Sequence, residues 1–180
     1  MKIYELTFDV DKYQMLVPVD DRDYDGSYLW VNGQLKLSSW LAPAMRWTEK
    51  EHSGESIPDI ARINPGFFAF SNKAVGITGT ILSEFGELLE LPVDGKLFLA
   101  FNPTVIVDCL NVEQSGWRIN RRGERGRLLS PVLNQAKLNG IKLFQISDRH
   151  SSLYASDEFF ELVIKNGLTG LTFTPVKLAS

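Results

Sequence analysis

The sequence predicts an α+β protein with a mixed, mainly antiparallel sheet and two main helices. Short apolar runs bounded by turn residues recur along the chain and are typical of strands. Helical apolar spacing is confined to two segments. The first covers residues 72–91, and the second lies between Ser156, which is expected to cap the helix, and Gly167, which is expected to end it. Because strands and helices do not alternate regularly, a parallel α/β fold is disfavoured.

The expected strands are short and rich in aliphatic and aromatic residues. They are residues 3–8, 14–19, 96–101, 104–110, 142–146, 152–155 and 168–176. The stretch YLWV-NG-QLKL, Tyr28–Leu37, predicts a β-hairpin, because Asn32 and Gly33 both tolerate the positive φ of a type I′ turn.

The first helix is expected to begin after Ser71, whose hydroxyl can cap it, and to end at Pro92. Its apolar stripe runs over Ala74–Leu89. Gly76 and Gly79 lie one turn apart and are expected to allow close packing against a sheet. The opposite face is expected to hold solvated glutamates, which are Glu84, Glu87 and Glu90.

Length and composition indicate one domain, residues 1–180, with a β-rich part over 1–56 and a core part over 57–180. The single cysteine, Cys109, excludes an internal disulfide framework and fits a reducing compartment. The N-terminus has no apolar h-region, and no apolar run reaches about 18 residues. We therefore expect a cytoplasmic protein without membrane contact.

Motifs of common enzymes and metal sites are absent from the sequence. It contains no phosphate loop, no G-x-S-x-G elbow, no H-E-x-x-H and no C-x-x-C. His52, His150 and Cys109 offer too few ligands for a zinc site, and Cys109 is expected to be a buried, inert thiol. We expect a protein that is not an enzyme and uses no cofactor or metal.

The stretch DDRDYDGSYLWVN, from Asp20 to Asn32, begins like a calcium loop. Its twelfth ligand position is Asn32, however, and a neutral amide cannot replace a bidentate carboxylate. Two interpretations remain: a polar lead-in to the hairpin, or an acidic patch that contacts a basic partner. The candidate contact residues are Asp20, Asp21, Asp23, Asp25, Tyr28 and Trp30.

The stretch WRINRRGERGRL, Trp117–Leu128, is the most basic in the chain. Three interpretations remain: an exposed, flexible loop with solvated or ion-paired side chains, a contact with nucleic acid, and a contact with an acidic protein surface. The chain carries a net charge of −3 and no motif for nucleic-acid binding, so nucleic acid is not the favoured partner. The candidate contact residues are Arg118, Arg121, Arg122 and Arg125, and Arg127 completes the cluster.

Three stretches resemble a family of bacterial immunity proteins from polymorphic-toxin and type VI secretion systems, formerly a domain of unknown function. They are Pro58–Gly76, Val105–Ser115 and Leu153–Val176. Their motifs are an F-S-x-x-A helix start at Phe70, a V-D-x-L-(D/N)-x-x-x-S segment from Val107, and a G-L-T-G ending that closes on P-V. The likeness covers most of the core part apart from the arginine run.

The resemblance implies a binding protein without chemistry of its own. Such a protein would bind one cognate toxin domain and block its active site or its access to substrate. Many toxins of this kind are nucleases with basic clefts, which an acidic segment would suit. The alternative is a nucleic-acid-binding module that uses residues 118–127.

Overall fold

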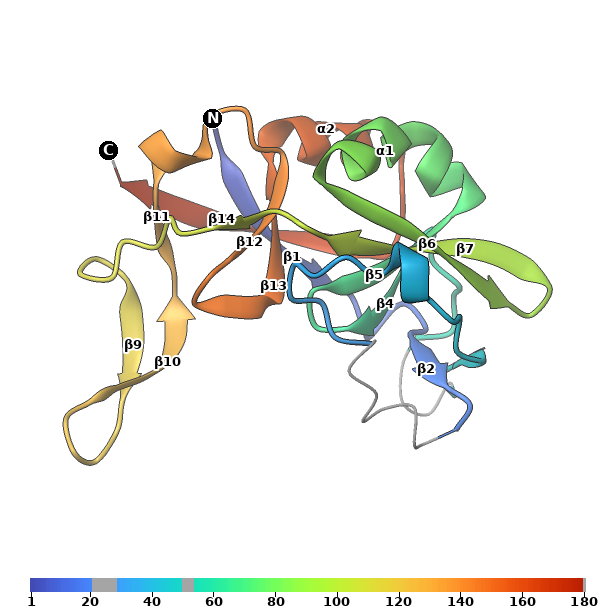
Figure 1. Ribbon diagram of the computed structural model, residues 1–180, viewed down its shortest axis with the longest axis horizontal. Coiled ribbons are helices and arrows are strands. Elements are labelled where there is room, and N and C mark those ends of the chain that lie inside the picture. The colour runs from blue at the N-terminus through green and yellow to red at the C-terminus, as the bar shows by residue number, and fades with distance from the viewer. Residues whose placement is uncertain (21–28, 50–53, 180) are drawn as a thin grey trace.

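The computed structural model describes residues 1–20, 29–49 and 54–179, which form an α+β fold with mainly antiparallel sheets, as expected (Figure 1). The helices are α1 (Asn72–Phe85), α2 (Asp157–Lys165) and the 3₁₀ turns η3 (Leu37–Ser39) and η4 (Gln135–Leu138). The strands are β1 (Ile3–Phe8), β2 (Leu16–Pro18), β3 (Met45–Trp47), β4 (Ile60–Asn64), β5 (Phe67–Ser71), β6 (Gly86–Val93), β7 (Lys96–Pro103), β8 (Ile106–Val107), β9 (Gly116–Ile119), β10 (Arg125–Ser130), β11 (Val132–Asn134), β12 (Leu143–Ile146), β13 (Arg149–Ser156) and β14 (Leu171–Ala179).

Two sheets carry the fold. The larger has the strand order β11-β14-β1-β13-β12-β8, in which the two outermost pairings, β11 with β14 and β12 with β8, are parallel. The smaller has the order β4-β5-β7-β6 and is entirely antiparallel. Because β1 lies between β14 and β13, the first and last strands of the chain share one sheet.

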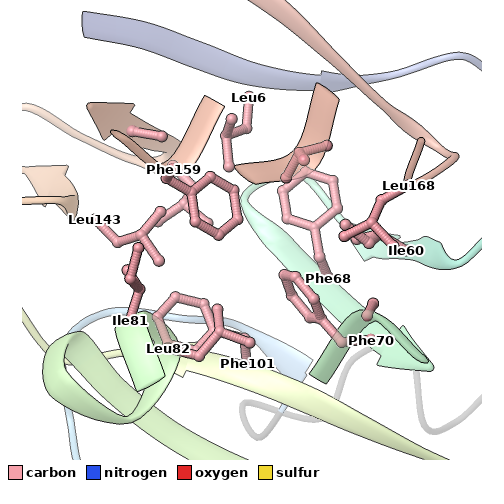
Figure 2. Close-up of a cluster of buried hydrophobic side chains, with 14 of the residues drawn as sticks. Leu6, Ile60, Phe68, Phe70, Ile81, Leu82, Phe101, Leu143, Phe159 and Leu168 are labelled. Carbon is pink, nitrogen blue, oxygen red and sulfur yellow. The ribbon is translucent and has the colours of Figure 1, made fainter. Parts of the chain in front are cut away.

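The main core lies where both helices meet the two sheets (Figure 2). The aromatic rings of Phe68, Phe70, Phe101 and Phe159 are almost completely buried there, and Phe70 packs edge-on against Phe101 at 6.3 Å between ring centroids. Each such ring contributes roughly 1.5–3 kcal/mol through burial. This core fixes α1 and α2 on one side of the molecule, as Figure 1 shows.

Two further clusters cover other faces of the sheets. One joins Leu89 and Leu91 of β6 to Leu29 and Val31 of the segment that crosses the smaller sheet. The other packs Ile3 and Tyr154 of the larger sheet against loop and hairpin side chains, among them Leu110 and Leu128. Side chains of β1 alternate, so Glu5 and Thr7 share a face with Ile3 and lie opposite the helix-covered core.

The predicted hairpin over Tyr28–Leu37 is wrong. Residues 29–36 form no strand, and Asn32 uses its own side-chain oxygen to accept a hydrogen bond from the Gln34 backbone N–H. Gly33 does take a positive φ of +81°, but its backbone lies against Ile106, where a Cβ would come within 2.5 Å of a methyl group. Tertiary contacts therefore override the local turn preference.

Side chains of the smaller sheet hold this segment, which we call the covering segment (residues 29–44). The Asn64 amide donates to the Leu29 carbonyl, and the Asn102 amide donates to the Gln34 carbonyl at 2.8 Å. The Glu87 carboxylate accepts from the backbone N–H groups of residues 36 and 37 at 2.7 and 3.2 Å. These side chains therefore satisfy four backbone groups of the segment without strand pairing.

The first helix ends at Phe85, seven residues before Pro92, and the chain continues as β6. In β6 the buried residues Leu89, Leu91 and Val93 alternate with exposed ones, which is the period of a strand. Glu87 and Glu90 therefore lie on a strand, not on a solvated helix face, and Glu87 is half-buried in hydrogen bonds.

Other predicted ends are confirmed. The Ser71 hydroxyl accepts a hydrogen bond from the Ala74 N–H at 3.2 Å, which caps α1. Gly167 takes the left-handed conformation after α2, with a φ of +59°.

The strand expected over 104–110 is reduced to β8, and the Asp108 side chain after it is 81% exposed and pairs with Lys137.

The expectation that Gly76 and Gly79 pack closely on a sheet is wrong. A Cβ added at Gly76 would meet no heavy atom within 4 Å, and one at Gly79 would only touch Val75 at 3.4 Å. Both glycines therefore weaken α1 without a packing gain.

Gly76→Ala is expected to raise the free energy of unfolding by about 1 kcal/mol, because alanine restricts the unfolded chain and suits a helix interior. Urea unfolding followed by circular dichroism measures the change. Gly167→Ala is the matched control and is expected to lower stability, since its φ is +59°. Equal stability of Gly76→Ala and the parent protein would contradict the prediction.

Candidate partner-binding hairpin

The arginine run forms a β-hairpin. Strands β9 and β10 pair antiparallel, with Trp117 opposite Leu128 and Ile119 opposite Arg125. The hairpin projects from the larger sheet, away from both helices (Figure 1). The exposure expected for this stretch is confirmed, but the stretch forms two paired strands where a loop was expected. We call residues 116–130 the arginine hairpin.

Packing and hydrogen bonds anchor the root of the arginine hairpin. Leu128 is buried in the cluster on the larger sheet, and the Trp117 indole N–H donates to the Val112 carbonyl at 3.2 Å. The Ser115 hydroxyl accepts from the Val132 N–H at 2.9 Å. A Cβ at Gly116 would lie 2.2 Å from the hydroxyl oxygen of Ser130 on the opposite strand, so a larger residue there would require the serine side chain to move. The hairpin therefore leaves the body from a fixed base.

Asn120 organises the tip. Its carbonyl accepts from the Gly123 N–H, and its side-chain oxygen accepts from the N–H groups of Arg122 and Glu124 at 2.9 and 3.0 Å. Gly123 takes a φ of +79°. This is a type I turn followed by a left-handed glycine, and the signal that would have found it is Asn120-x-x-Gly123. Arg121 and Arg122 occupy the two central turn positions.

The arginine hairpin carries five arginines and one glutamate, and all five arginines are exposed. Arg125 pairs with Glu113 at 3.2 Å. The other four form no ion pair within the described part of the chain, and these are Arg118, Arg121, Arg122 and Arg127. Guanidinium groups in this state are donors for carboxylate or phosphate oxygens of a partner.

Asp20, the acidic candidate that the structure describes, is separate from this hairpin. Asp21, Asp23, Asp25 and Tyr28 lie outside the described residues. Asp20 is half-buried shortly after β2, and Trp30, with 50% exposure, begins the covering segment. Strand β2 and the arginine hairpin lie at opposite ends of the long axis (Figure 1). The structure thus gathers the four arginine candidates into one element and places Asp20 in another part of the fold.

Other kinds of site find no support in residues 1–20, 29–49 and 54–179. No group of three or more His, Cys, Asp or Glu residues there is arranged to hold a metal ion. Cys109 is fully buried, as expected, and burial raises the pKa of its thiol to about 11, which keeps it protonated. Neither described α-helix has the length and apolar character needed to span a bilayer.

No model of a known protein family matches the chain, and no curated protein matches its sequence. The resemblance to immunity proteins therefore rests on the quoted motifs alone. In the structure these motifs build the start of α1, the turn that leads into β9, and the α2–β14 unit. They account for packing and helix ends, and none of them supplies the exposed arginines.

Gly123→Ala is expected to loosen the tip, because a left-handed conformation costs an alanine about 1–2 kcal/mol. A Cβ there would meet nothing within 4 Å, so strain is the sole effect. Amide hydrogen exchange at Glu124, whose N–H is bonded to Asn120, should become about tenfold faster. Gly123→Asn is the control, since asparagine tolerates this conformation. Unchanged exchange in Gly123→Ala would contradict the assigned turn.

Proposed function

We propose that this protein is an immunity protein that binds a cognate secreted toxin domain and blocks its active site or its access to substrate. The observation that carries the proposal is the arginine hairpin, an anchored element whose exposed arginines mostly lack ion pairs within the described residues. Arginine is enriched among residues that dominate binding energy at protein interfaces. The protein would act in a bacterial cytoplasm, without a cofactor or a catalytic step.

Charge indicates the kind of surface that would meet the hairpin. Five arginines against one glutamate favour an acidic patch on the toxin domain, because complementary charge speeds encounter and selects the partner. The acidic segment from Asp20 to Asp25 would suit a basic partner instead, such as a nuclease cleft. The two candidate surfaces therefore predict toxin domains of opposite charge.

The test is co-expression with the C-terminal domain of a secreted toxin encoded by the neighbouring gene. Growth should be restored by this protein, and the two proteins should elute together in size-exclusion chromatography. A variant with residues 118–127 replaced by a two-residue Asn-Gly turn is expected to lose both effects while keeping its own fold. Failure of the intact protein to restore growth, with both proteins soluble, would reject the proposal.

A nucleic-acid-binding module is the second candidate, and the shape of the hairpin favours it. A two-stranded ribbon fits the DNA major groove, and arginines along it would contact phosphates. The indole of Trp117, however, is half-buried, and its N–H donates to a carbonyl at the root of the hairpin. This placement disfavours stacking of the ring on a base. A gel-shift at low salt distinguishes the candidates: a complex that weakens steeply with salt supports this module, and absence of a complex excludes it.

A further inference from the structure

A pocket of about 170 Å³ lies where the two sheets meet. The turn between β4 and β5 closes it, because Gly66 rests on the backbone of β13, where a Cβ at that glycine would lie 3.0 Å from the carbonyl carbon of Ser151. Its polar lining comes from three strands: Glu5 from β1, Arg62 from β4, and Arg149 with Ser152 from β13. The fold thus brings together charged groups that are far apart in the sequence.

Glu5 and Arg149 neutralise one another in this pocket. One carboxylate oxygen of Glu5 lies 3.2 Å from a terminal guanidinium nitrogen of Arg149 and accepts a hydrogen bond from the Ser152 hydroxyl at 2.7 Å. The two charged side chains are only 15% and 24% exposed. Their pairing accounts for one positive and one negative charge.

Arg62 supplies a second positive charge without a counterion. Its Nε is buried and has no hydrogen-bond partner, and Arg62 forms no ion pair within the described residues. Burial also lowers the pKa of Arg62, because the side chain is half-buried and its cation is partly removed from solvent. The pocket therefore holds one positive charge that no carboxylate of the described residues balances.

We infer that this pocket binds a single carboxylate group, which Arg62 recognises through the terminal nitrogens of its guanidinium group, because its buried Nε is closed to a ligand. A carboxylate has two coplanar oxygens that match the fork of a guanidinium group, and its single charge balances the excess in the pocket. A phosphate dianion would add a second negative charge close to Glu5, which is unfavourable. Ser151 and Ser152 also line the pocket.

The source of the carboxylate is either a small organic acid or an acidic side chain of a bound protein. A second hollow of about 420 Å³ shares Glu5 with the pocket and is also lined by Leu129 and Ser130 of the arginine hairpin. A protein that contacts the hairpin would therefore lie next to the pocket. This second source rests on the proposed function, whereas the pocket itself does not.

The experiment titrates the isolated protein with sodium acetate, and separately with inorganic phosphate, at constant ionic strength in a chloride background. Nitrogen-15 NMR follows the Arg62 Nε–Hε resonance and the backbone amides of Ser151 and Ser152. A saturable shift at these positions with acetate is expected, with no shift at Arg121 or Arg122. Absence of a shift at Arg62, or a response to phosphate but not to acetate, would overturn the inference.

Two variants separate binding from general salt effects. Arg62→Gln is expected to abolish the shifts of the Ser151 and Ser152 amides, and its fold should persist because Arg62 pairs with no carboxylate among the described residues. Glu5→Gln keeps the shape of the side chain but removes its negative charge, so acetate should bind up to about fivefold tighter. Weaker acetate binding by Glu5→Gln would contradict the assigned charge balance.

Adding the toxin domain then identifies the source. If the domain saturates Arg62 and acetate no longer shifts its resonance, the carboxylate belongs to the protein partner. If the domain binds and acetate still shifts the resonance, the ligand is a free organic acid. Because the acetate titration needs no toxin, its result stands even where the proposed immunity function fails.

Discussion

Glu87→Ala is expected to lower the free energy of unfolding by about 2–3 kcal/mol, since one carboxylate holds three donors. Glu87 accepts from the backbone N–H groups of Lys36 and Leu37 and from the Asn102 amide at 2.7, 3.2 and 2.8 Å. Asn102 also donates to the Gln34 carbonyl. Alanine at this position would leave these donors unsatisfied and detach the covering segment from the smaller sheet.

Urea unfolding measures this loss, and two variants control it. Glu87→Gln retains an oxygen acceptor and should lose less than the alanine variant. Glu90→Ala lies on the same strand with an exposed side chain, so it should change stability by no more than about 0.5 kcal/mol. If Glu87→Ala matched Glu90→Ala, the carboxylate would not be what holds the covering segment.

The same carboxylate predicts a pH dependence. Burial on its own would raise the pKa of Glu87, but hydrogen bonds from Lys36, Asn102 and Leu37 outweigh it and lower the pKa below its usual value of 4.5. A depressed pKa in the folded state adds stability above the unfolded pKa, and this is lost as pH falls through the folded value. The stability difference between the parent protein and Glu87→Gln should therefore shrink below about pH 4.5. A constant difference down to pH 3 would contradict it.

Local signals predicted the parts of the fold that local interactions determine. The Ser71 cap and the Gly167 stop are confirmed because each depends on groups within a few residues of itself. The boundary between α1 and β6 was missed because the leucines of β6 continue the apolar stripe of the helix. The spacing of these leucines fits both the helical period of about 3.6 residues and the strand period of about 2. Gly86 decides the boundary, since a Cβ there would lie 2.3 Å from the Asn102 carbonyl of β7, a contact that depends on tertiary structure.

The two candidate sites also differ in how far the sequence predicts them. The cluster of arginines is visible in the sequence, and so is the Asn120-x-x-Gly123 pattern of the turn that joins β9 and β10. The pocket was not, because Glu5, Arg62 and Arg149 meet only after three strands from distant parts of the chain come together. The hairpin predicted over Tyr28–Leu37 failed because its turn dipeptide is used for a contact with Ile106.

Neutralising the arginine hairpin is expected to weaken binding of the toxin domain by about 100-fold or more. The variant replaces the four candidates with glutamine, namely Arg118, Arg121, Arg122 and Arg125. Interface arginines often contribute more than about 1 kcal/mol each, and each 1.4 kcal/mol is a factor of ten in affinity. Isothermal titration calorimetry at several salt concentrations measures the loss, and the salt dependence of the association rate should flatten as well.

Stability should change little in this variant, because the four side chains are exposed and the surface pair of Arg125 with Glu113 contributes at most about 1 kcal/mol. A drop in affinity would therefore report a lost contact. The matched control removes four exposed cations elsewhere, which are Lys12, Arg46, Lys96 and Lys165. If this control weakened binding equally, overall charge rather than the hairpin would be responsible.

A second comparison determines which surface meets the partner. Replacing Asp20, Asp21, Asp23 and Asp25 with asparagine should strengthen binding slightly if the toxin domain presents an acidic patch to the hairpin, because a like charge is removed. Weaker binding of this aspartate variant, with full affinity in the arginine variant, would assign the contact to the acidic segment and to a basic toxin domain. Each kind of partner predicts a different pair of affinities for the two variants, so one titration series identifies both the binding surface and the charge of what it binds.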